Sequence, residues 1–145
     1  MTLGSRIKNF RKRVGMTQRE LGVAVGFSPF TADVRIAQYE NGSRKPKPGI
    51  LNNLAAVFGI STAVMNVPDI ENKATLMQTL FAMEDRYRLK PIRFDGETFL
   101  CVDVLNGCDG KGLNALLDEW QQHLAKLERG DITSEEYDHW RYNYS

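Results

Sequence analysis

The N-terminal part of the chain begins with an apolar stripe of helical period. Leu3, Ile7, Phe10 and Val14 recur at the spacing of one helix face, and Gly15 predicts that this helix ends there. The opposite face of the predicted helix is basic. It carries Arg6, Lys8, Arg11, Lys12 and Arg13.

Two more helices follow with clear start and stop signals. Thr17 and Glu20 form a capping-box pattern, which predicts a second helix that stops at Gly26. A third helix contains Ile36 and Tyr39, and the pair Asn41–Gly42 predicts its end.

A fourth helix is expected over roughly residues 48–58, because its apolar residues face one side and Gly59 follows. Ser61 is placed to cap a short fifth helix that breaks before Pro68. Five short helices with one tight turn between the second and third predict a helix-turn-helix domain.

Two stretches in this region resemble a known family. MTQRELGVAVGFS and IAQYENGSRKPKPGILNNLAAVFGI are similar to the XRE family of phage-repressor and Cro-like DNA-binding domains. The resemblance covers roughly the first 65 residues and is carried by TQxxL followed by IxxYExG. It implies a dimeric transcription regulator that places its third helix in the major groove.

The same resemblance implies which residues contact the DNA backbone. Gln18 stands at the start of the second helix, where the backbone N–H groups and the helix dipole favour a phosphate. Four further phosphate contacts are expected after the third helix. They are Asn41, Arg44, Lys45 and Lys47.

The helical period divides the third helix into an inner and an outer face. Ala32, Ile36 and Tyr39 are expected to pack inward. The outer stripe combines a donor pair for guanine, an amide suited to adenine, a hydroxyl, and methyl groups for thymine. These predicted base-reading residues are Arg35, Gln38, Thr31 and Val34.

The segment before Tyr39 is longer than the family pattern. Ser28 and Tyr39 are eleven positions apart, a surplus of about four residues, which is roughly one helical turn. One interpretation extends the third helix, with Ser28 as N-cap and Pro29 at its first position. The other, which we favour, enlarges the turn and begins the helix at about Thr31.

Residues 67–145 predict a small α+β domain. A helix is expected from Asp69 to about Tyr87, followed by two strands around Asp95–Gly96, the second continuing to Val104. A loop over residues 106–110 precedes a long helix that stops at Gly130. A second capping box, Thr133 to Glu136, opens a last helix. The fold class is therefore mainly α, with a five-helix domain over residues 1–66 and an α-β-β-α-α domain over residues 67–145.

Charge separates the same two regions. Ten Lys and Arg against three acids give residues 1–66 a net charge of +7, whereas nine against fifteen give residues 67–145 a net charge of −6. This asymmetry predicts that only the first region faces a polyanion. The composition is that of a soluble globular protein, and the lack of a signal-peptide pattern favours a cytoplasmic location.

Little in the sequence suggests catalysis, a metal or a cofactor. Cys101 and Cys108 lack the spacing of a zinc site, and they are expected to be reduced thiols. A nucleophile pair of Cys108 with His123 lies in no known catalytic motif. We therefore predict a protein that is not an enzyme and binds no cofactor or metal.

The predicted function is sequence-specific regulation of transcription, most simply as a repressor that binds a palindromic operator as a homodimer. The second domain would dimerise, with Trp120, Leu124 and Trp140 as interface candidates; filling the domain's own core is an equal alternative for the tryptophans. A further alternative is an antitoxin or similar regulator, in which the second domain binds a partner protein and DNA binding serves autoregulation.

Overall fold

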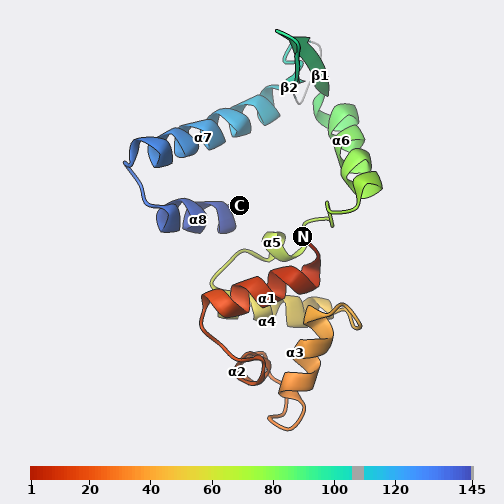
Figure 1. Ribbon diagram of the computed structural model, residues 1–145, viewed down its shortest axis with the longest axis vertical. Coiled ribbons are helices and arrows are strands. Elements are labelled where there is room, and N and C mark those ends of the chain that lie inside the picture. Colours follow the sequence, from red (N-terminus) through yellow and green to blue (C-terminus); the bar gives the residue numbers. More distant parts are fainter. Residues whose placement is uncertain (106–109, 145) are drawn as a thin grey trace. The chain divides into compact units, whose positions relative to one another are not determined.

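The computed structural model describes residues 1–105 and 110–144. These residues divide into two compact units (Figure 1). The first unit consists of residues 1–71 together with the C-terminal residues from 139 onward, and the second of residues 72–138.

Residues 1–71 form the five expected helices around one apolar core. Ile7, Leu21, Ile36 and Leu54 are fully buried in it, one from each of the first four helices. The helices are α1 (Leu3–Arg13), α2 (Gln18–Ala24), α3 (Ala32–Glu40), α4 (Pro48–Phe58) and α5 (Thr62–Met65).

The predicted capping box at the start of α2 is confirmed. The Thr17 hydroxyl accepts the Glu20 N–H at 3.2 Å, and the Glu20 carboxylate accepts the Thr17 N–H at 2.7 Å. Both groups satisfy backbone donors that have no partner inside the helix. Ser61 likewise caps α5, where its hydroxyl accepts the Ala63 N–H.

Helices α2 and α3 pack closely because residue 22 has no side chain. A Cβ at Gly22 would lie 2.6 Å from both the Cβ and the carbonyl oxygen of Ala32. Such distances are below any van der Waals contact, so a larger residue here would push α3 away from α2. Gly22 and Ala32 therefore fix the approach of the two helices that the enlarged turn connects.

The structure resolves the two interpretations of that turn. Helix α3 begins at Ala32 with Thr31 as its N-cap residue, and the Thr31 N–H donates to the Ser28 carbonyl at 3.0 Å. The enlarged turn is thus confirmed, and the longer helix starting at Pro29 is wrong. The Thr31 side chain does not cap the helix, since its hydroxyl lies 3.4 Å from the Ser28 carbonyl oxygen instead.

The C-terminal end of α8 (Ser134–Tyr142) packs on the core of the first unit. The Tyr142 ring meets Phe10 edge-on, with centroids 5.0 Å apart and planes at 82°. The Tyr142 carbonyl accepts the Ser61 N–H at 2.9 Å, and the Arg13 guanidinium lies 5.2 Å from the Tyr142 ring centroid. These contacts make the last turn of α8 a clasp on α1 and α5.

The second unit has the expected α-β-β-α-α order. The hairpin turns at Asp95 and Gly96, whose φ angles of +48° and +81° match the predicted Asp-Gly turn. Its elements are α6 (Lys73–Tyr87), β1 (Leu89–Phe94), β2 (Glu97–Val102), α7 (Gly110–Arg129) and the first residues of α8.

Two predicted boundaries in this unit are wrong. Helix α6 begins at Lys73 rather than Asp69, because the Asn72 side-chain oxygen accepts the N–H groups of Ala74 and Thr75 and caps the helix there. Strand β2 ends at Val102 rather than Val104. The predicted loop over residues 106–110 falls mostly on residues 106–109, which lie outside the described residues.

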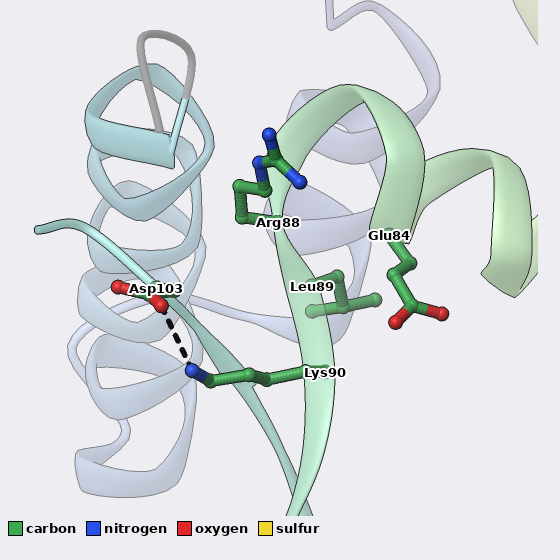
Figure 2. A pocket seen from close by; sticks show the side chains of 5 residues that line it. All are labelled: Glu84, Arg88, Leu89, Lys90 and Asp103. Carbon is green, nitrogen blue, oxygen red and sulfur yellow. Dashed lines mark hydrogen bonds and ion pairs between the residues drawn. The ribbon is translucent and has the colours of Figure 1, made fainter. Parts of the chain in front are cut away.

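The second unit buries little apolar surface. Leu89, Val102 and Leu113 form its buried cluster, with partly buried side chains from α6 against it. At the base of the hairpin, Lys90 Nζ donates to the Asp103 carboxylate at 2.8 Å, beside a shallow hollow (Figure 2). Within the part of the chain that the structure describes, no helix is long and apolar enough to cross a membrane.

Substituting Tyr142 tests the clasp. Tyr142→Ala should lower the free energy of unfolding of the first unit by about 1–3 kcal/mol, because it removes an aromatic pair and buried apolar area. The measurement is a urea titration followed by Trp140 fluorescence in a Trp120→Phe background. The exposed His139→Ala is the matched control and should change the free energy of unfolding by less than about 0.5 kcal/mol. Equal effects of the two substitutions would contradict the clasp.

Candidate nucleic-acid interface

Helix α3 presents the four predicted base-reading residues on successive turns. Thr31 is exposed at the N-cap, and Val34 follows with 54% of its surface exposed. Arg35 directly after it and Gln38 one turn further on are half-buried. Residues three and four positions apart share a helix face, so the structure brings these side chains together in one strip.

The opposite face of α3 is anchored in the core as predicted. Ala32 and Ile36 are fully buried and Tyr39 is 5% exposed. The Tyr39 ring lies 6.2 Å from the Phe27 ring, between centroids. This burial fixes the rotation of α3 about its axis and therefore which residues face outward.

The Gln38 amide is only partly available for reading a base. Its Oε1 is buried and has no hydrogen-bond partner among the described residues. A bidentate contact with adenine uses both amide atoms. Because an unpaired buried oxygen costs free energy, a rotation that exposes it to a base or to water would be favourable. Gln38 must make that rotation to read adenine as expected.

A buried carboxylate ties α3 to the two preceding helices. Arg11 of α1 donates to Glu40 from Nε at 2.6 Å and from Nη2 at 3.2 Å, in a bidentate pair. Gln18, the first residue of α2, donates from Nε2 to the same carboxylate at 2.9 Å. The Glu40 side chain is 5% exposed. One carboxylate thus joins α1, α2 and the C-terminal end of α3.

These donors outweigh the cost of burying the charge. Burial raises the pKa of Glu40, but the hydrogen bonds from Arg11 and Gln18 and the charges of Arg11 and Lys8 hold it below its ordinary value of 4.5. The hydrogen bond to Glu40 in turn raises the pKa of Arg11. Glu40 is therefore ionised at neutral pH, and the contact is an ion pair.

Of the five predicted phosphate-contact residues, Gln18 belongs to this network and the other four follow Glu40 along the chain. One N–H of the Gln18 amide binds Glu40, and its nitrogen carries a second. Asn41 Oδ1 accepts the Ser43 N–H at 2.9 Å, which leaves the amide nitrogen of Asn41 as the end that could donate outward. The other three are exposed cations on the segment before α4. They are Arg44, Lys45 and Lys47.

Besides Arg13, which lies over the Tyr142 ring, two arginines of the predicted basic face of α1 have structural partners instead. Arg11 binds Glu40, as described. Arg6 is 7% exposed and donates to the backbone carbonyls of Val64 at 3.0 Å and Val67 at 2.6 Å. Burial lowers the pKa of Arg6. The part of the positive charge that faces outward is therefore smaller than the sequence count implies.

In its described part, the second unit shows no cluster of side chains that could hold a metal ion. Among residues 1–105 and 110–144, no three His, Cys, Asp or Glu side chains gather as metal ligands. His123 Nδ1 lies 3.0 Å from the Glu119 carbonyl oxygen, and Cys101 is half-buried. Cys108, the residue considered with His123 as a nucleophile pair, lies outside the described residues.

The three interface candidates differ in their surroundings. Trp120 is 51% exposed and donates from Nε1 to the Tyr137 hydroxyl at 2.7 Å, and Leu124 is 38% exposed on the same helix. Trp140 is half-buried in the first unit, with its ring 5.5 Å from that of Tyr144. The α7 pair is thus available to a partner, while Trp140 is partly covered by its own chain.

Comparison with known proteins finds a similarity that lies within the first unit. Residues 7–65 match a family model described as helix-turn-helix. The chain is also similar to the crystal structure of the transcriptional regulator BswR, with 28% identity and a TM-score of 0.44, over 58% of this chain and 94% of that chain. No curated protein matches the chain.

Replacing Glu40 tests the network and its pH dependence. At pH 7, Glu40→Gln should lower the free energy of unfolding by about 3 kcal/mol, because Arg11 loses its partner. The pKa of Glu40 is depressed in the folded state, so its contribution is present above about pH 4.5 and is lost as the pH falls through the folded pKa. Urea titrations should therefore show the variant and the original protein converging as the pH falls below the depressed pKa of Glu40. A difference that is constant with pH would contradict the ion pair.

Proposed function

We propose that this chain, whose residues 7–65 match a helix-turn-helix family model, is a homodimeric repressor of transcription that binds a palindromic operator. The observation that carries the proposal is the outward strip of α3. This strip carries side chains that can read base edges. Exposed cations follow α3 directly, on the segment before α4.

The strip supplies the chemistry for reading base edges. The Arg35 guanidinium is the right donor pair for guanine O6 and N7, and the Val34 methyl groups suit the thymine methyl. Thr31 adds a short hydroxyl at the N-terminal end, where recognition helices make their first base contacts. Gln38 reads adenine once its amide has turned outward.

Phosphate contacts would hold this helix in register. Arg44, Lys45 and Lys47 are exposed, and Gln18 and Asn41 each keep an amide N–H to donate. Contacts of this kind set affinity and orientation but carry little sequence information. The discrimination between operators therefore rests on α3.

The second unit supplies a surface for dimerisation. Four large apolar residues on α7 share one side of the helix and are between 37% and 51% exposed. They are Leu116, Leu117, Trp120 and Leu124. An apolar face of this size on a small domain is typical of an interaction surface. A two-fold dimer would place the two α3 helices about 34 Å apart, one DNA turn, which calls for a palindromic site.

Selection from a random DNA pool, followed by light scattering of the free protein, tests this function. The expected result is one palindromic sequence, with half-sites about 10 base pairs apart, and a dimer in solution. A Leu124→Glu variant should be monomeric, because it places a charge in the apolar face. No enriched sequence would overturn sequence-specific regulation. A monomer that still enriches one half-site would instead indicate that a partner protein covers α7.

Two substitutions separate base reading from phosphate binding. Arg35→Ala should cost about 1–3 kcal/mol on the selected operator and little on random DNA. Lys45→Ala, the matched control, should weaken binding to both and reduce the slope of log affinity against log salt by about one unit. Titrations of both variants at several salt concentrations provide the measurement. Equal losses for Arg35→Ala on operator and random DNA would contradict its reading role.

A further inference from the structure

The enlarged turn before α3 exposes an aromatic ring. Phe30 is 89% exposed, more than any other aromatic side chain in the described part of the chain. A single exposed apolar side chain is common on protein surfaces, so what Phe30 does depends on where the turn places it. Four surplus residues therefore do more than connect two helices: they place one apolar side chain outside the core.

The backbone around Phe30 is held in place. The Phe30 N–H donates to the Ser28 hydroxyl at 3.4 Å, and the Thr31 N–H donates to the Ser28 carbonyl at 3.0 Å. From α2, Arg19 Nε donates to the Pro29 carbonyl at 3.1 Å. The ring of Pro29 also fixes its own φ angle. The turn thus presents the Phe30 side chain from a defined position, which lowers the entropy cost of a contact.

Phe30 lies at the end of α3 that approaches DNA. It directly precedes Thr31, the N-cap residue, and stands four positions before the exposed Val34. In helix-turn-helix domains the N-terminal residues of the recognition helix contact base edges. Phe30 therefore stands next to the N-terminal end of the outward strip of α3.

The surroundings of Phe30 favour a nucleic acid over an apolar protein surface. Arg19 is bonded to the turn itself, and Arg35 follows on the first turns of α3. These cations, one bonded to the turn and one on the helix that follows, match a groove lined by phosphates, whereas an apolar partner would have to desolvate them. The apolar group that the major groove offers is the thymine C5-methyl.

We propose that Phe30 contacts a thymine methyl group and so reads one additional base pair at the edge of each operator half-site. This inference rests on the proposed function and deepens it. The base pair is distinct from the one that Val34 reads, since Phe30 stands in the turn, four positions before Val34 in the helix. The turn insertion thus lengthens the half-site that this domain recognises.

A double-mutant cycle between protein and DNA tests the contact. In the selected operator, each thymine of one half-site is replaced in turn by deoxyuridine, which lacks only the methyl group. At one position the original protein should lose about fourfold in affinity, the effect of one buried methyl group. Phe30→Ala should bind the unmodified operator more weakly and should not respond to deoxyuridine at that position.

Two control variants define the result. Val34→Ala should lose its response to deoxyuridine at a different position, and Val14→Ala, exposed at the end of α1, should keep both responses. Phe30→Ala should unfold at the same urea concentration as the original protein, because the ring is exposed.

The outcomes separate this inference from the proposed function. If the original protein enriches an operator but Phe30→Ala responds to every deoxyuridine as the original does, the Phe30 contact is overturned and the function stands. A Phe30→Ala defect that appears only in binding to a protein partner also overturns the contact with thymine. If no operator is enriched, the proposed function itself fails.

Discussion

The fold of the first unit depends on the ionised carboxylate of Glu40. Through Arg11 and Gln18 it joins α1 and α2 to the C-terminal end of α3, while Gly22 against Ala32 fixes the other end of that helix. With both ends held and Ile36 and Tyr39 buried, α3 has one permitted rotation. Its outward strip is a consequence of that constraint. Four of the phosphate-binding candidates come just after this anchored end of α3 in the chain, beginning with Asn41, which directly follows Glu40.

The elements that could be predicted from the sequence are those set by local interactions. The capping boxes at Thr17 and Thr133 each join residues three positions apart, and both are formed as expected. The Asp95–Gly96 turn depends on two φ angles that few other pairs adopt easily. The predicted start of α6 is wrong because Asp69 and Asn72 are both good N-cap residues, and nothing in the local pattern ranks them.

The candidate site is predictable only as far as helical periodicity reaches. That period assigns Ala32, Ile36 and Tyr39 to the core correctly. It does not indicate that Arg6 bonds to the carbonyls of Val64 and Val67, or that Arg11 pairs with Glu40, because these partners are distant in sequence. The local hint is Glu40, the single acid between Asp33 and Asp69. Helical periodicity likewise does not decide between a longer α3 and a larger turn, because both keep the same residues of α3 facing inward.

The clasp at Tyr142 has a consequence for how the two units influence each other. The chain leaves the first unit at residue 71 and returns at residue 139, so docking the clasp closes all of residues 72–138 into a loop. Loop closure costs entropy that rises with the number of freely moving residues. While the Tyr142 contacts last, residues 72–138 can unfold only as a closed loop, which has less conformational entropy than a chain with one free end.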